Sequence, residues 1–164
     1  MSILNLLNLN EAGNPMKLVY QLDEDLKNDQ ERVSLTQNLT LDKSRPFLGL
    51  RGTHGLFASY EWWDNILQRK MPLLFVSGVI QRAYIAGQDQ QGVNNMVDLK
   101  LDDGSVRAVG IYTNDKADVQ LFKPGYRVSI VYALDELKKQ PAPDGRVNYS
   151  KVALEMAVSL SPNK

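Results

Sequence analysis

The amino-acid sequence predicts a mainly β protein: a small closed barrel of five strands with one short helix between strands three and four. Alternating apolar residues recur through 71–164, which is typical of strands with one buried face. Residues 102–105, Asp-Asp-Gly-Ser, form a strong hairpin signal between two such runs. Gly78 lies inside an unusually long first strand, where a barrel needs a bend. Residues 1–70 are predicted to be an N-terminal β/α extension that packs on the barrel and caps it.

Composition narrows the class of protein further. The chain has 164 residues, of which 43% are hydrophobic and 23% are charged, as in an ordinary globular domain with an elaboration. It contains no cysteine, which excludes disulfides, thiolate nucleophiles and cysteine-based metal sites. Its 19 Lys and Arg residues balance 19 Asp and Glu residues. That balance argues against a protein whose main task is binding duplex nucleic acid.

The N-terminal arm, residues 1–14, mixes Leu and Ile with Asn. It has no positive leading segment and no continuous apolar run, so it does not resemble a signal peptide. No apolar run in the chain approaches the ~20 residues of a membrane span, and we expect a cytoplasmic protein. The aliphatic content predicts that the arm docks, on its own domain or on a second copy; the alternative is a mobile terminus.

Residues 16–42 are predicted to form a hairpin with a long loop. Apolar residues alternate in 16–22 and again in 33–41, so both segments are expected as strands. The connection, 23–32, is polar and mostly acidic. It lacks the ligand spacing of a calcium loop, and a solvated loop is therefore expected.

A glycine-rich segment precedes a predicted short helix at about 60–69. Gly49, Gly52 and Gly55 permit unusual backbone angles. Ser59 is a favourable N-cap, and Glu61 lies in the first turn, where the helix dipole favours an anion.

Both tryptophans, Trp62 and Trp63, lie in this helix, close in sequence to the only histidine, His54. Exposed rings could bind a base, a sugar or a partner protein. The structural alternative is a helix over one mouth of the barrel with the tryptophans as its plug. His54 has no nucleophile, orienting group or metal ligand at a recognisable spacing, so a structural, hydrogen-bonded histidine is expected.

The barrel strands follow from alternation and from the turns between them. In the second strand, Val97, Leu99 and Leu101 share one face, and Asp98 and Lys100 share the other. Residues 113–122 suit one or two helical turns that end at Pro124-Gly125. The five strands are expected at 73–86, 94–101, 106–112, 126–134 and 152–160.

The order of strand, hairpin, helix, strand, long loop and strand resembles the oligonucleotide/oligosaccharide-binding (OB) fold over about 71–160. Gly78 and the sequence Lys-Pro-Gly-Tyr-Arg-Val at 123–128 strengthen the resemblance. Ligands of OB folds lie across strands two and three and the adjoining loops. The resemblance therefore implies a ligand face, with an ordinary polar surface as the alternative. That face would contain Gln88, Asn94, Asn95, Asp98, Lys100, Arg107, Lys138, Lys139 and Arg146, with Tyr84 and Tyr112 for stacking.

Together these features predict a non-enzymatic OB-like binding module that acts through protein–protein interaction, with another protein or a second copy of itself. The alternative is a single-stranded nucleic-acid-binding protein that uses the face of strands two and three. An enzyme is disfavoured because a second histidine, a cysteine and a nucleophile motif are lacking. We expect no catalytic residue, metal or cofactor. The candidate binding residues are His54, Trp62, Trp63, Tyr84, Lys100, Arg107, Tyr112, Lys138, Lys139 and Arg146.

Overall fold

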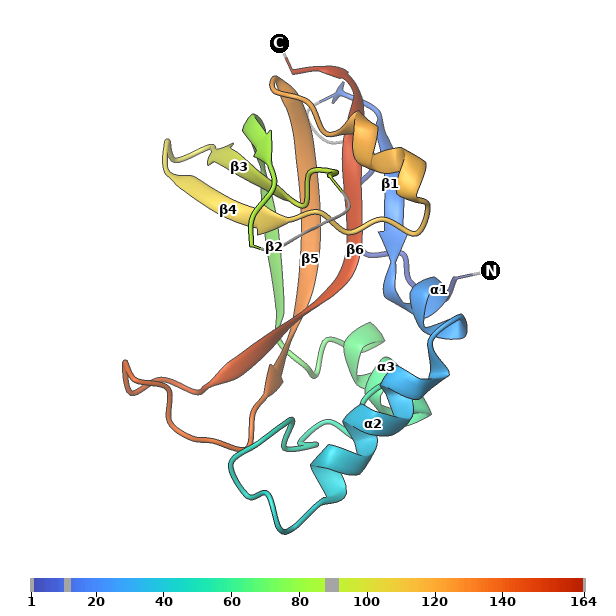
Figure 1. Ribbon diagram of the computed structural model, residues 1–164, viewed down its shortest axis with the longest axis vertical. Helices are drawn as coiled ribbons and strands as arrows, with labels where there is room; N and C mark the ends of the chain where they lie inside the picture. Colours follow the sequence, from blue (N-terminus) through green and yellow to red (C-terminus); the bar gives the residue numbers. More distant parts are fainter. Residues whose placement is uncertain (1, 11–12, 88–91, 164) are drawn as a thin grey trace. The chain divides into compact units, whose positions relative to one another are not determined.

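The computed structural model describes residues 2–10, 13–87 and 92–163, and this part of the chain is mainly β (Figure 1). Its sheet has six strands in the order β1-β6-β5-β2-β3-β4. The strands are β1 (Met16–Gln21), β2 (Leu73–Tyr84), β3 (Met96–Leu101), β4 (Val106–Gly110), β5 (Tyr126–Glu136) and β6 (Tyr149–Pro162). The helices are α1 (Leu22–Lys27), α2 (Gln30–Leu41), α3 (Tyr60–Leu67) and the 3-10 helix η2 (Lys116–Leu121). None of these described helices has the length and apolar character needed to cross a membrane.

The sheet is open, so the predicted closed barrel of five strands is not confirmed. All five expected barrel strands are present, and η2 lies between β4 and β5 as predicted. The sixth strand is β1, which the sequence pattern had assigned to a hairpin in the extension. It pairs antiparallel with β6, from Met16 opposite Ser159 to Gln21 opposite Glu155. Because β5 lies on the other side of β6, β6 has no free edge left with which to close a cylinder.

The chain divides into two compact units. The sheet unit comprises Met1–Leu22, Phe75–Val131 and Ala153–Lys164, and the helical unit comprises Asp23–Leu74 and Tyr132–Val152. Strands β2, β5 and β6 contribute residues to both. The predicted division at residue 70 stays a prediction, and each unit is described by itself below.

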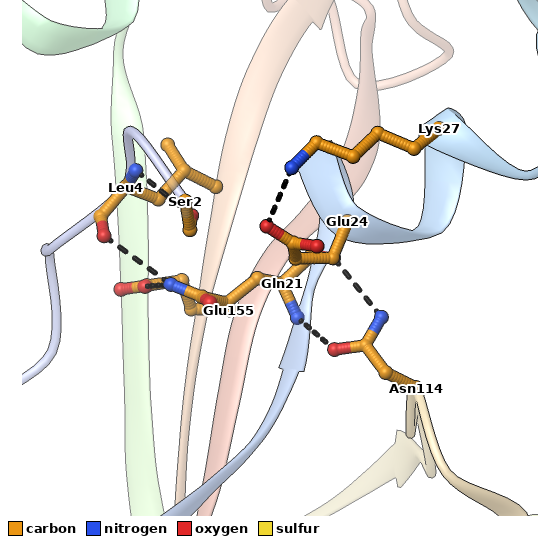
Figure 2. Close-up of polar contacts among 7 residues, drawn as sticks. All are labelled: Ser2, Leu4, Gln21, Glu24, Lys27, Asn114 and Glu155. Carbon is orange, nitrogen blue, oxygen red and sulfur yellow. Dashed lines mark hydrogen bonds and ion pairs between the residues drawn. The ribbon is translucent and has the colours of Figure 1, made fainter.

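The N-terminal arm docks on the sheet unit, which confirms the expectation that it would dock. Glu155 of β6 is only 1% exposed and holds the arm by its carboxylate. One carboxylate oxygen accepts hydrogen bonds from the backbone N–H groups of Leu6 and Leu7, at 2.7 and 3.1 Å. The other accepts from the side-chain amide of Gln21, at 2.9 Å, and that amide also donates to the carbonyl of Leu4, at 3.2 Å (Figure 2). The arm is therefore part of the unit's hydrogen-bonded structure.

The prediction of a strand at 33–41 is wrong, because these residues form most of α2. Asp29 caps this helix, and its carboxylate accepts the backbone N–H of Arg32 at 3.2 Å. Of the apolar residues in the segment, only Leu35 and Leu39 share one side of the helix, so the apolar spacing favoured a strand and the Asp29 cap is the local signal for a helix. The polar connection at 23–32 is likewise not a loop, since α1 and the first turn of α2 occupy it. The helix predicted at 60–69 is confirmed as α3, with Ser59 as its N-cap.

Gly78 permits a close approach between β2 and β3. A Cβ atom at this position would lie 2.7 Å from the backbone carbonyl oxygen of Lys100, which is closer than real Cβ contacts. The bulge expected at Gly78 occurs farther along the strand, where the register of β2 against β3 shifts between Ile80 and Arg82. A glycine is required at position 78 because the two strands leave no room there for a side chain.

Gly78→Ala is expected to lower the free energy of unfolding by about 1–3 kcal/mol, because the added methyl group collides with backbone that has no room to move. Gly110→Ala is the control, since its Cβ would meet only the ring of Tyr112, a side chain that can rotate. Urea denaturation measures both. Equal stability of the two variants would contradict the steric explanation.

Glu155→Ala is expected to lower the free energy of unfolding by about 2 kcal/mol or more, because it leaves several amide donors without an acceptor. It is also expected to release the arm, which limited proteolysis followed by mass spectrometry detects as faster cleavage within residues 2–10. Glu155→Gln keeps one carbonyl oxygen and is expected to lose less stability. Unchanged proteolysis in Glu155→Ala would show that apolar packing alone holds the arm.

Candidate functional site

The residues predicted to bind a partner fall on both units. The sheet unit carries Tyr84, Lys100, Arg107 and Tyr112. The helical unit carries His54, Trp62, Trp63, Lys138, Lys139 and Arg146. Gln88, which the OB resemblance placed on the ligand face, lies outside the described residues.

A polar cluster joins β2 to β3 on the sheet unit. The carboxylate of Asp98 accepts a hydrogen bond from the Tyr84 hydroxyl at 2.9 Å and pairs with the guanidinium of Arg82 at 2.9 Å. That guanidinium also lies over the Tyr84 ring, 4.1 Å from its centroid. The bond from Tyr84, followed by the one from Arg82, lowers the pKa of Asp98, and the same carboxylate raises the pKa of Tyr84. One face of the Tyr84 ring is thus already covered by a cation.

Lys100 and Arg107 lie on opposite faces of the β3–β4 hairpin. Arg107 is opposite Leu99, whose side chain is buried, whereas Lys100 is opposite Val106. Side chains of directly opposed residues share a face, and neighbours along a strand alternate. The two cations therefore do not form one continuous surface. Tyr112 packs on Tyr20, with ring centroids 5.5 Å apart.

Trp62 belongs to the core of the helical unit. It is fully buried, and its ring meets those of Phe57 and Trp63 edge-on at 5.0 and 4.8 Å. Its indole N–H donates to the carboxylate of Asp135 at 2.9 Å. Trp62 is therefore a core residue, and Trp63 is half-buried beside it, whereas the predicted plug over a barrel mouth stays a prediction.

Asp135 is a buried carboxyl group that no sequence pattern pointed to. It is 0% exposed, and burial raises its pKa, while the hydrogen bond from Trp62 and the nearby His54 act in the opposite direction. Its second carboxylate oxygen and Nδ1 of His54 are buried without a hydrogen-bond partner among the described residues. Because the carboxyl group is closed off from solvent, it cannot meet a substrate in this conformation. The sequence placed Asp135 just after the predicted strand 126–134, whereas in the structure it lies within β5.

Lys138 holds the loop that follows α2. Its ammonium donates to the backbone carbonyls of Leu39, Asp42 and Arg45 at 2.6, 3.2 and 3.1 Å. A cation at this position also stabilises the C-terminal end of the helix. Lys139 and Arg146, by contrast, are exposed. Lys138 is therefore a structural residue at the edge of a surface rather than a free charge.

The helical unit contains an apolar groove of about 350 Å³ between α2, the loop that follows it, and the ends of β5 and β6. The sequence analysis did not predict this groove, because it expected a strand at 33–41 and one wall of the groove is a side of the helix α2. The apolar residues that line it are Leu35, Leu39, Leu50, Phe57, Leu137 and Val152. Within residues 2–10, 13–87 and 92–163, no group of three His, Asp or Glu residues is arranged to hold a metal ion.

A comparison with known protein families gives one match, and it spans both units. The model of a family described as "Immunity protein RhsI2" matches residues 16–159, from the start of β1 to the later part of β6. The chain belongs to the RhsI2 immunity protein family. No curated protein matches the chain. Membership of this family supports a role in protein–protein interaction, in agreement with the leading hypothesis from the sequence.

Asp135→Asn is expected to flatten the pH dependence of stability. Because burial raises the pKa of Asp135 above 3.8, the folded chain binds this proton more tightly than the unfolded chain. The stability of the wild type should therefore fall as pH rises from about 4 through the folded-state pKa and then level off.

The asparagine variant cannot titrate at this position but keeps an oxygen for the Trp62 indole. Its stability relative to the wild type should consequently rise across the same pH window. Urea denaturation at several pH values between about 4 and 7 measures the difference. Parallel curves for the two proteins would contradict a raised pKa.

Proposed function

We propose that this chain is a non-enzymatic immunity protein that binds a toxin protein and blocks its action. The observation that carries the proposal is the family match over residues 16–159. An immunity protein acts by occupying its partner, so affinity and shape matter, and no chemical step is required of its own residues.

Exposed apolar side chains of the helical unit support a binding role. Leu35, Leu41, Phe47 and Leu48 are all exposed to solvent within one stretch of sequence. Exposed apolar side chains that gather in one region mark interaction surfaces more often than those scattered singly. The stretch also adjoins the groove, whose lining includes Leu35 and Gly49.

The other interpretations from the sequence have no comparable support. The resemblance to OB folds, single-stranded nucleic-acid binding and self-association all stay predictions. On the sheet unit, the cations proposed for nucleic-acid binding lie on opposite faces of the β3–β4 hairpin.

The proposed function predicts that the chain protects cells from one particular toxin. Co-expression with that toxin should restore growth, and the two proteins should co-purify as a stable complex. The control is an unrelated toxin, against which no protection is expected. If growth is restored while the purified proteins show no binding, the chain acts on a product of the toxin, and direct inhibition is excluded.

A further inference from the structure

One face of α2 forms a wall of the groove in the helical unit. Arg32, Leu35, Thr36 and Leu39 line it, and their spacing places them along one side of a helix. None of the twelve residues of α2 is buried, and Leu35 is 61% exposed. On this side of α2, Leu35 and Leu39 lie one turn apart between the polar residues Arg32 and Thr36. Apolar side chains one turn apart that line an open groove are the feature that helix-in-groove and peptide-in-groove interactions use.

The groove is already formed in the free chain. The Lys138 ammonium fixes the loop after α2 by three carbonyl contacts, and the Gln37 side chain donates to the carbonyl of Phe57 at 2.8 Å. The backbone at Gly49 packs directly against Leu39, since a Cβ there would lie 2.8 Å from that side chain. A partner would therefore not have to order these segments, which reduces the entropic cost of binding.

Basic residues outnumber acidic ones in the two segments that supply most of the groove's lining, and Arg32 also pairs with Asp25 of α1 at 3.7 Å. Segments 32–51 and 136–152, which supply most of its lining, contain eight basic residues and three acidic ones, although the whole chain is neutral. The three carboxylates each have an arginine within 4 Å: Asp42–Arg45 at 3.6 Å, Glu136–Arg51 at 3.7 Å and Asp144–Arg146 at 3.9 Å. The basic residues are Arg32, Lys43, Arg45, Arg51, Lys138, Lys139, Arg146 and Lys151. Among them, Lys138 is already bound to three backbone carbonyls and has a structural role.

We propose that this groove binds an acidic amphipathic segment of the toxin, in which apolar side chains enter the groove and flanking Asp or Glu residues face the surrounding cations. The inference rests on the proposed function and names the surface that performs it. The basic residues around the groove favour a partner segment with negative charge. The aliphatic side chains that line the groove favour apolar side chains inside it.

The lining favours a protein over a nucleic acid as the occupant. Phe57 is the aromatic residue among the described lining residues, and it is 3% exposed. Arg32 already lies over its ring, 5.6 Å from the centroid. Binding of single strands needs exposed rings on which bases can stack, and this ring is not accessible.

The test compares two equally exposed leucines in the full-length chain. Leu35→Glu places a carboxylate in the groove, and Leu160→Glu makes the same change at a residue of the sheet unit that is 62% exposed. Both sites are on the surface, so neither change should prevent folding, which circular dichroism verifies. Arg32→Glu is a third variant that reverses a charge in the groove wall.

Two fluorescein-labelled peptides serve as probes in fluorescence polarisation. One alternates Leu and Phe with Asp and Glu, and the other has Lys in place of each acidic residue. The acidic peptide should bind the wild type and Leu160→Glu alike, and should bind Leu35→Glu about tenfold more weakly or worse. Its affinity should fall with added salt, and Arg32→Glu should shift preference toward the Lys peptide.

Equal binding of the two peptides, unchanged binding in Leu35→Glu, or saturable binding of only a labelled single-stranded oligonucleotide would overturn the inference.

Repeating the titration with the purified toxin separates the inference from the proposed function. Loss of toxin affinity in Leu35→Glu but not in Leu160→Glu supports both. A toxin that binds the wild type and Leu35→Glu equally well uses another surface, which overturns the inference and leaves the function standing. A toxin that does not bind the wild type at all overturns the function, and the peptide titration then still decides whether the groove recognises acidic segments.

Discussion

The sheet unit depends on burying β6 on both of its faces. From Val152 to Ser159 every residue of the strand is buried, so each face needs its own cover. One face carries Leu154, Met156 and Val158, and the opposite face carries Ala153, Glu155 and Ala157. The carboxylate of Glu155, between the two alanines, accepts hydrogen bonds from backbone N–H groups of the N-terminal arm. Burying a carboxylate or a backbone N–H group without a hydrogen-bond partner destabilises the folded state. Here the carboxylate accepts hydrogen bonds from these N–H groups, so both are paired.

Alternation in the sequence located all six strands, but it also placed a strand at 33–41, where the chain forms α2. Alternation could not determine which strands pair. β1 and β6 come from opposite ends of the sequence, and the alternation within one strand does not indicate which strand it pairs with. The apolar spacing of residues 33–41 favours a strand, and the signal for a helix was local, in the Asp29 cap. Once that segment was taken as a strand, the face shared by Arg32, Leu35 and Leu39 could not be recognised.

The candidate binding residues stay predictions, and the structure shows only where each of them lies. Lys138, Lys139 and Arg146 are all in the helical unit that contains the groove, and their residue types pointed to a charged surface. Trp62, for which the sequence left a binding platform and a buried role open, is a core residue whose indole N–H donates to Asp135. The overall neutrality of the chain concealed the local excess of cations, because a sum over 164 residues carries no information about where the charges gather.

The contact between Glu155 and Leu6 joins residues 149 positions apart, and this separation has a consequence for how the protein matures. A ribosome delivers the arm and β1 long before it delivers β6. During most of translation these early segments therefore have neither the strand nor the carboxylate that they need. Contacts of such long range also slow folding, because a large loop must close before they form. The sheet unit consequently becomes complete only after β6 has emerged, and a nascent chain that stalls earlier leaves its first strand exposed to neighbouring polypeptides.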